Sequence, residues 1–168
     1  GGAGGVGRVR AFDPEDAPGT VRLLMDAYRG AASAECFAPR GRIEEWAWYT
    51  RQLLRTPACG VLLPAVCFAA DLPGIGLAGV ALTTTIAPGV AHLAQLAVAP
   101  AAQGRGVGRQ LLDAVLDQLQ VLGYERVTLM VSEDNAPARS LYAAAGFTAG
   151  PRFLFASRAM PARLARAS

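Results

Sequence analysis

Lysine is absent from this chain of 168 residues, so its 16 basic side chains are all arginines. The absence excludes a phosphate-binding loop that depends on lysine, and it excludes a mechanism that proceeds through a lysine Schiff base. The arginines are spread along the chain, and the formal net charge is only +3. A nucleic-acid-binding surface normally needs a denser basic patch, so we expect no nucleic-acid partner.

Cysteine and histidine are also scarce. The three cysteines, Cys36, Cys59 and Cys67, show no C-x-x-C spacing, and His92 is the only histidine. This pattern predicts neither a disulfide framework nor a metal site, and it fits a reducing, cytoplasmic location. A cysteine nucleophile paired with His92 is one alternative chemistry. A serine hydrolase is disfavoured because no G-x-S-x-G motif occurs.

Long hydrophobic runs are missing as well. No segment reaches the ~18 uncharged apolar residues that a membrane span requires, so we expect no membrane association. The length suits one domain with its own core, which we place at residues 6–160. We interpret residues 1–5 as a disordered leader or a cloning remnant, and residues 161–168 as a basic C-terminal tail.

Hydrophobic periodicity and turn residues predict strands that alternate with helices. In chain order, we expect a strand at 6–12, helices at 13–30 and 42–55, strands at 60–70, 76–86 and 90–99, a helix at 106–122, a strand at 126–132, a short helix capped by Asn135, and strands at 147–149 and 152–160. The strand at 126–132 is apolar on both faces, which predicts a central position in the sheet. Because a helix joins it to the strand at 90–99, these two strands should be parallel.

The helix expected at 42–55 combines aromatic and charged residues. Helical spacing places one set of apolar side chains on its buried side. These are Ile43, Trp46, Ala47, Leu53 and Leu54. Trp48 and Tyr49 fall on the remaining surface with the charged groups.

A glycine-rich stretch, V-A-P-A-A-Q-G-R-G-V-G-R, follows a predicted strand and begins a predicted helix. Gly104, Gly106 and Gly108 leave the backbone accessible, so successive N–H groups can face one anion. The helix start adds unpaired N–H donors, and Arg105 and Arg109 add positive charge. We interpret this stretch as a pyrophosphate-binding loop.

A second glycine pattern, G-x-G-x-x-G at residues 74–79, matches the fingerprint of dinucleotide-binding domains. That fingerprint must end a strand and begin a helix. Residues 80–86 are rich in threonine and branched aliphatic residues and favour a strand instead. We therefore assign no dinucleotide site here.

Residues 103–108 resemble the Q/R-x-x-G-x-G/A signature of the GCN5-related N-acetyltransferases, the GNAT family. Residues 135–142, followed by Gly146 and Phe147, resemble the N-x-x-A-x-x-L-Y-x-x-x-G-F segment of the same family. The resemblance is close over residues 93–147. It implies an α/β (α+β mixed sheet) fold: a mixed central sheet of about seven strands, helices on both faces, and a splayed parallel strand pair that holds the cofactor.

The resemblance implies acetyl-coenzyme A (acetyl-CoA) as the acyl donor and no metal. The pantetheine arm of acetyl-CoA would pair with the backbone of Leu96, Ala97 and Val98 as an added strand. The glycine-rich loop would hold the pyrophosphate through Gln103, Gly104, Arg105, Gly106, Val107, Gly108 and Arg109. Asn135 would orient the cofactor, and Tyr142 would act as general acid toward its sulfur.

Many members of the family carry a glutamate as general base on one of two strands, where this chain has Gln95 and Met130. Neither side chain can accept a proton at neutral pH. His92 lies on the same strand as Gln95 and has a suitable ordinary pKa, so it is the candidate base. Two alternatives need no histidine base. A water molecule could relay the proton to Glu35, Glu44 or Glu45, or the substrate amine could bind already neutral.

The leading prediction for the reaction is direct acetyl transfer to a primary amine of a small molecule in a ternary complex. Glu35, Glu44, Glu45 and Trp48 are the candidates for holding its ammonium group, by charge and cation–π contact. Two alternatives stay open: a protein N-terminal acetyltransferase and a non-catalytic acyl-CoA-binding regulatory module. A homodimer is a further prediction, with the apolar residues 153–155 as a candidate edge strand.

Overall fold

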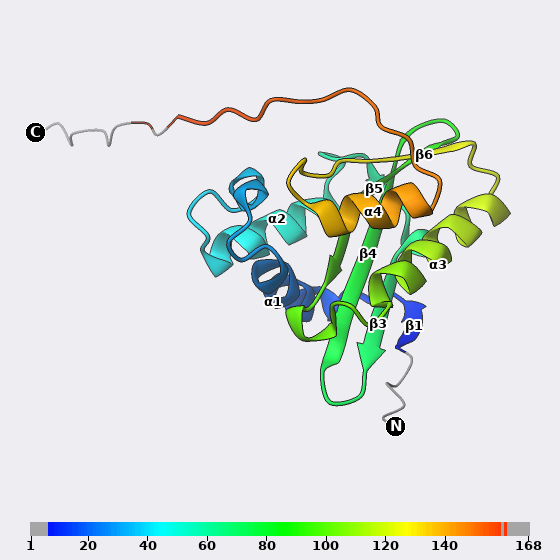
Figure 1. Cartoon of the computed structure of the whole chain (residues 1–168), viewed down its shortest axis with the longest axis horizontal. Helices are drawn as coiled ribbons and strands as arrows, with labels where there is room; N and C mark the ends of the chain where they lie inside the picture. Colours follow the sequence, from blue (N-terminus) through cyan, green and yellow to red (C-terminus); the bar gives the residue numbers. More distant parts are fainter. Residues whose placement is uncertain (1–6, 159, 161–168) are drawn as a thin grey trace, which may run out of the picture.

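The computed structural model describes residues 7–158 and 160 (Figure 1). The segments predicted as a leader, 1–5, and as a tail, 161–168, lie outside the described residues. The strands are β1 (Arg8–Ala11), β2 (Val61–Leu62), β3 (Phe68–Leu72), β4 (Gly76–Ala87), β5 (Val90–Val98) and β6 (Arg126–Leu129). The α-helices are α1 (Ala17–Ala27), α2 (Ile43–Arg55), α3 (Val107–Val121) and α4 (Ala136–Ala144). Short 3-10 helices are η1 (Pro14–Asp16), η2 (Ala32–Cys36), η3 (Pro64–Val66) and η4 (Pro100–Ala102).

The strands form one mixed sheet. β1, β3, β4, β5 and β6 lie side by side in that order, and β2 pairs with β4. The pairings are antiparallel except for β5 with β6, which are parallel and are connected through α3. This arrangement confirms the predicted mixed α/β sheet and the predicted parallel pair.

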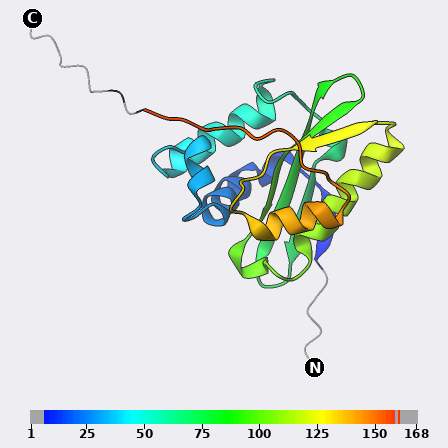
Figure 2. The same ribbon diagram turned by 45° about the horizontal axis from the view of Figure 1, so that its top comes forward.

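Helices cover both faces of the sheet, as predicted (Figures 1 and 2). On one face, α3 buries Leu112 and Val115 in a core that also receives side chains of α4. On the other face, Leu24 of α1 and Trp46 of α2 pack against Val80 of β4. The middle of the sheet is therefore shielded from water on both sides.

The close approach of α3 to β4 depends on Gly79. A Cβ atom at this position would lie 2.8 Å from Leu111 Cδ1 and 3.1 Å from the carbonyl oxygen of Ala97. Only glycine fits between the helix and the two strands without a shift of the helix. Gly79 thus sets the height of α3, and of the loop before it, above the sheet.

The strand predicted at 60–70 is interrupted. β2 ends at Leu62, η3 follows, and β3 begins only at Phe68. Pro64 at the start of η3 has no N–H to donate to a neighbouring strand, so the continuous strand was a wrong prediction at this point.

The strand predicted at 126–132 as a central strand is shorter than expected and lies at the edge of the sheet. β6 ends at Leu129, and the next side chain, Met130, is 68% exposed. Apolar residues on both faces indicated burial, but they carry no information about the number of neighbouring strands.

The two final strands are also a wrong prediction. The described residues of 147–149 and 152–160 form no strand, and that part of the chain runs across the top of the molecule toward the C-terminal end (Figure 1). Gly150 and Pro151 lie between the two segments and disfavour strand pairing there. Within residues 7–158 and 160, the sheet therefore has six strands where about seven were expected.

The buried side of α2 differs from the predicted one. Ile43 is the first residue of the helix and is exposed, whereas Thr50 is buried. Tyr49, predicted on the outer surface, turns inward, and its ring centroid lies 4.8 Å from that of Phe37. The segment around η2 covers this side of α2, so the buried face is wider than the apolar stripe indicated.

None of the helices in the part of the chain that the structure describes is long and apolar enough to cross a membrane.

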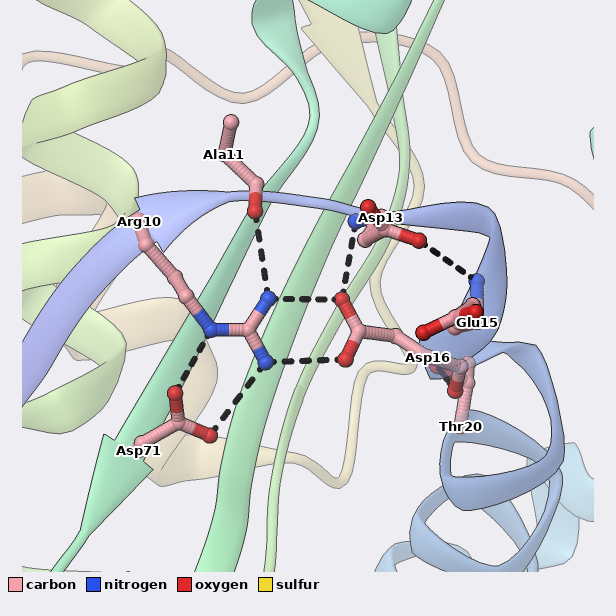
Figure 3. Close-up of polar contacts among 7 residues, drawn as sticks. All are labelled: Arg10, Ala11, Asp13, Glu15, Asp16, Thr20 and Asp71. Atoms are coloured by element: carbon pink, nitrogen blue, oxygen red, sulfur yellow. Dashed lines mark hydrogen bonds and ion pairs between the residues drawn. The ribbon is translucent and has the colours of Figure 1, made fainter.

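An arginine with two carboxylate partners fixes the start of the fold (Figure 3). Arg10 on β1 donates from Nε to Asp71 on β3 at 2.6 Å, and from both terminal nitrogens to Asp16 of η1 at 2.7 and 2.8 Å. Asp16 also accepts the backbone N–H of Asp13, and Asp13 caps the same turn by accepting the N–H of Glu15. Arg10 thus links β1, β3 and the start of the first helical segment.

We expect Arg10→Ala to lower the free energy of unfolding by about 1–2 kcal/mol, because it leaves two partly buried carboxylates without their donor. The hydrogen bond from Arg10 holds the pKa of Asp16 below its ordinary value. The stabilisation is therefore present above the ordinary pKa of an aspartate and is lost as the pH falls through the lowered pKa. Urea unfolding of both proteins at neutral and acidic pH tests this.

The matched control is Arg29→Ala. Arg29 forms an exposed ion pair with Asp26, and its loss should cost less than about 0.5 kcal/mol. Equal losses in the two variants would contradict the structural role of Arg10.

Candidate active site

The parallel strands β5 and β6 separate partway along their length. Their pairing ends at Leu93 opposite Leu129, whereas β5 continues to Val98. From Ala94 to Val98, β5 has no partner on the β6 side, which is an edge of about 17 Å at the usual rise per residue. This confirms the splayed pair expected from the family resemblance.

A β-bulge lies at the point of separation. The pairing of β4 with β5 shifts between Leu82 and Thr83 and leaves Ala94 as the extra residue. A bulge changes which face each following side chain points to. After it, Gln95 contacts Tyr28, which follows α1, and Tyr49 of α2, and Leu96 packs on the α3 side.

The glycine-rich loop follows β5 and η4. Gly104 and Gly106 have φ angles of +73° and +80°, a left-handed conformation that side chains disfavour. Gly106 is the N-cap of α3, and no side chain caps the first turn. The first N–H groups of α3 thus face the loop without a side-chain acceptor, as an anion site requires.

Gly108 differs from the other two loop glycines. Its φ is not left-handed, and a Cβ there would lie 3.5 Å from Leu141 and Val98, an ordinary contact. The fold therefore requires glycine at 104 and 106 for backbone conformation, and it does not require glycine at 108.

The two loop arginines have different surroundings. Arg109 donates to both carboxylate oxygens of Asp113, at 2.8 and 3.0 Å, so its charge is already paired within α3. Arg105 is exposed and forms no ion pair with the residues that the structure describes. Gln103 donates to the carbonyl oxygen of Val98 at 3.3 Å, which ties the loop to the end of β5.

Tyr142 and Asn135 lie on and before α4. Asn135 caps this helix by accepting the N–H of Ala138 at 3.2 Å, as predicted. The Tyr142 ring packs against Phe147 with centroids 5.7 Å apart. Burial raises the pKa of Tyr142 to about 12, and the nearby phenol of Tyr28 adds to the rise. Its hydroxyl has no hydrogen-bond partner in the described part of the chain, so it is free to donate to a ligand.

Gln95 joins two tyrosines in an arrangement that sequence reasoning missed. Gln95 is only 2% exposed; its carbonyl accepts from the Tyr28 hydroxyl at 2.9 Å, and its amide nitrogen donates to the Tyr49 hydroxyl at 2.8 Å. The two tyrosine rings belong to an aromatic cluster with Phe37 and Trp46. Tyr28 directly follows α1 and Tyr49 lies on α2, and no spacing in the sequence indicates that they meet.

His92 lies next to the last residue pair before the strands separate. Its Nδ1 is 2.9 Å from the hydroxyl of Thr128, its neighbour on β6. Burial lowers the pKa of His92, so the ring is neutral at neutral pH. The structure thus places the histidine at the closed end of the splayed region, with its Nε2 not engaged by Thr128.

The residues predicted to hold the acceptor amine are not joined to one another in the described structure. Glu45 caps α2 by accepting the N–H of Arg42, and it also binds the Arg40 side chain at 2.9 Å. Glu35 and Glu44 are exposed, and Trp48 is 58% exposed. The carboxylate of Glu45 is thus already engaged in holding the start of the helix.

A shallow, open depression of about 590 Å³ lies between the end of α1 and the residues that follow β5. It is lined by Asp26, Arg29, Ala99, Pro100 and Ala101. No cluster of three potential metal ligands occurs among residues 7–158 and 160.

Comparison with known proteins identifies the class to which this fold and site belong. The sequence pattern of the acetyltransferase (GNAT) family matches residues 21–147. The chain therefore belongs to the GNAT family of acetyltransferases.

Individual relatives match more narrowly. A mycothiol acetyltransferase of Beutenbergia cavernae is 55% identical over 53 residues, which are 32% of this chain and 18% of that protein. The chain thus spans about a fifth of the length of the curated relatives that it matches.

Solved structures share the fold at low sequence identity. The ribosomal-protein-S18-alanine N-acetyltransferase of Escherichia coli is 24% identical with a TM-score of 0.63, over 87% of this chain and 80% of that one. The PaiA N-acetyltransferase of Thermoplasma acidophilum, solved with coenzyme A, is 20% identical with a TM-score of 0.62, over 85% of this chain and 90% of that one.

We expect Gly106→Ala to lower the free energy of unfolding by about 1–2 kcal/mol, because alanine is strained in the left-handed conformation. The matched control is Gly108→Ala, which should be neutral or stabilise the protein by up to about 1 kcal/mol, because alanine is a better helix residue than glycine. Chemical denaturation of both variants without ligand measures this. The reverse order of stability would contradict the backbone geometry of the loop.

Proposed function

We propose that the chain transfers the acetyl group of acetyl-CoA to a primary amine of a small molecule, by direct attack while both substrates are bound. The observation that carries this proposal is the unpaired edge of β5, which is followed along the chain by η4, the glycine-rich loop and the uncapped start of α3. The edge of β5 offers backbone groups that can pair with amides, and the start of α3 offers N–H donors for an anion. Family membership supports the same reaction.

The dimensions of the site support acetyl-CoA as the donor. The pantetheine arm carries two amides and, at three backbone bonds per residue, is about as long as five residues of extended chain. The unpaired edge from Val98 back to Ala94 has the same length. In this proposal, the backbone of Leu96, Ala97 and Val98 binds the arm.

The pyrophosphate of acetyl-CoA would bind at the loop. The residues proposed to hold it are Gln103, Gly104, Arg105, Gly106, Val107, Gly108 and Arg109. Arg105 is the stronger candidate for a direct charge contact, because Arg109 is paired with Asp113. Asn135, which caps α4, is proposed to orient the cofactor as well.

Attack of the amine on the thioester requires a neutral amine, stabilisation of the tetrahedral oxyanion and a proton for the departing thiolate. A backbone N–H near Val98 is our candidate for the oxyanion. Tyr142 is our candidate donor to the sulfur. With its pKa at about 12, it stays protonated at neutral pH and stabilises the thiolate by a hydrogen bond more than by complete proton transfer.

His92 is the proposed base. Its Nδ1 faces the Thr128 hydroxyl, which lies 3.4 Å from the carbonyl oxygen of Ala91. When Thr128 donates to that carbonyl, it accepts from Nδ1–H, and His92 then keeps its Nε2 bare for a proton. Gln95, at the position where many family members have a glutamate, cannot take this role.

The choice of acceptor is supported by the names of relatives. The curated relatives named mycothiol acetyltransferase favour a small molecule. A solved neighbour named for ribosomal protein S18 alanine keeps a protein N-terminus as the second candidate. A non-catalytic acyl-CoA-binding module is the third. Glu35, Glu44 and Trp48 remain proposed contacts for the acceptor molecule.

Two further predictions concern the setting of the protein. The described cysteines are unpaired, and Cys36 and Cys59 are exposed, which supports a reducing, cytoplasmic location. Homodimerisation stays a prediction, supported only by the exposure of Phe153, Leu154 and Phe155.

The test of this function is acetyl-CoA-dependent release of free thiol with a panel of small amines and a panel of peptides. We expect release with small amines, and we expect Tyr142→Phe to lower kcat by about 10²-fold. Its Kd for acetyl-CoA, measured by calorimetry, should not change. Activity with peptides alone would favour the N-terminal acetyltransferase, and binding without release would favour the regulatory module. No binding of acetyl-CoA would reject the proposal.

The role of His92 can be measured directly, because it is the only histidine. In protein labelled with ¹⁵N-histidine, we expect its NMR titration to give a pKa below the ordinary value of about 6.5, because burial disfavours the charged ring. We expect His92→Gln to lower kcat by about 10²-fold. In the wild type, kcat should fall as the pH drops below the pKa of His92, and in the variant this fall should be absent. An unchanged kcat and pH profile would remove His92 from the mechanism.

A further inference from the structure

Gln95 places a neutral amide, held by hydrogen bonds at both ends, beside the unpaired edge of β5. Gln95 uses its carbonyl to accept from Tyr28 and its amide nitrogen to donate to Tyr49. Both ends of the amide are satisfied, and the group is nearly completely buried. Many family members have a glutamate at this position, which would place a negative charge next to the unpaired edge of β5. This chain has the neutral amide of Gln95 instead.

Four ionisable side chains around Gln95 are also uncharged at neutral pH. Burial raises the pKa values of Tyr28, which follows α1, and of Tyr49 on α2. Tyr142 on α4 has a pKa of about 12, and burial lowers that of His92 on β5. Each of these four side chains is in its neutral form near pH 7.

Charged groups on the neighbouring elements either have a partner or lie exposed. Asp26 of α1 pairs with Arg29 at 2.6 Å, and Glu45 of α2 pairs with Arg40 at 2.9 Å. Glu35 of η2 is exposed. Among the described residues, no carboxylate hydrogen-bonds to Gln95 or to its two tyrosines.

A neutral, buried site discriminates between amines by their basicity. An ammonium ion loses its hydration there without gaining a counter-ion, so the site favours the neutral amine. At pH 7, an α-amine with a pKa of about 7.8 is neutral some 10²-fold more often than an alkylamine with a pKa of about 10.4. A histidine base with a lowered pKa cannot make up this difference.

We infer that the acceptor is a weakly basic primary amine, such as the α-amine of an amino acid or the amine of an amino sugar, and that strongly basic alkylamines are poor substrates. This inference rests on the proposed function and adds the chemical class of the acceptor. Gln95, held between Tyr28 and Tyr49, is the specificity-determining residue.

The first test compares four amines in the thiol-release assay: glycinamide, glucosamine, butylamine and the side-chain amine of Nα-acetyl-lysine methylamide. We expect kcat/KM at pH 7 to favour the two weakly basic amines by about 10²-fold, and the preference to shrink about tenfold at pH 9 as the alkylamines lose protons. Glycinamide and glucosamine distinguish the two sources of a weakly basic amine. Equal kcat/KM for all four amines at pH 7 would overturn the inference.

The variant test is Gln95→Glu. A glutamate has the same length and can accept from both tyrosine hydroxyls, so the local packing should persist. We expect it to narrow the preference for weakly basic amines at least tenfold, because the carboxylate stabilises a bound ammonium or takes its proton. Gln95→Met is the matched neutral control and should leave the preference unchanged. A preference that is the same in the wild type and in Gln95→Glu would overturn the role of Gln95.

A binding measurement separates this inference from the proposed reaction. Calorimetry of glycinamide binding to the protein saturated with coenzyme A, in buffers of different ionisation enthalpy, counts the protons released. We expect nearly one proton per amine bound at pH 7, because the neutral form binds. Binding without proton release would overturn the inference. If no amine yields free thiol, the proposed function fails, and the proton count still decides whether the site selects neutral amines; if no amine binds, both fail.

Discussion

The separation of β5 from β6 beyond Leu93 is the constraint on which the rest of the molecule depends. A strand in the middle of a sheet normally satisfies its backbone on both sides. Here the bulge at Ala94 and the early end of β6 leave one side of β5 open over its last residues. Such an edge inside a sheet persists only if something else pairs with it or water fills it. The neighbouring elements are arranged around that opening: α3 and its loop at one end, His92 and Thr128 at the other, and the tyrosines along its sides.

Much of this arrangement could be predicted from the sequence, because certain residues have few alternative uses. Glycine at 104 and 106 is needed for a left-handed backbone, and Asn135 before Pro137 is typical of a helix start. The helix between two apolar strands required a parallel pair. These features depend on local chemistry or on chirality, and the structure confirms them.

The remaining features depend on contacts between segments far apart in the chain. The edge position of β6 depends on whether a later segment pairs with it, and periodicity cannot show that. Glu45 looked like a free carboxylate, but it serves as a cap because Arg40 and Arg42 lie in the turn before α2. Gln95 became informative only when two helices brought Tyr28 and Tyr49 to its two ends. From the sequence alone, Gln95 showed that the glutamate base of many family members is missing. It did not show that the amide lies at the centre of a cluster of neutral side chains.

The two walls of the opening differ greatly in how firmly they are held. β5 is paired with β4 from Val90 to Val98, near the middle of the sheet, whereas β6 is attached only through the four positions from Arg126 to Leu129. Elements with few backbone partners open at a lower free-energy cost than those in the middle of a sheet. Any wider separation of β5 and β6 should therefore come from movement of β6 together with the segment that leads to α4, while β5, which carries Gln95, stays in place. The side of the opening that bears Tyr142 on α4 is then the adjustable one, and it determines whether a bulky ligand can enter.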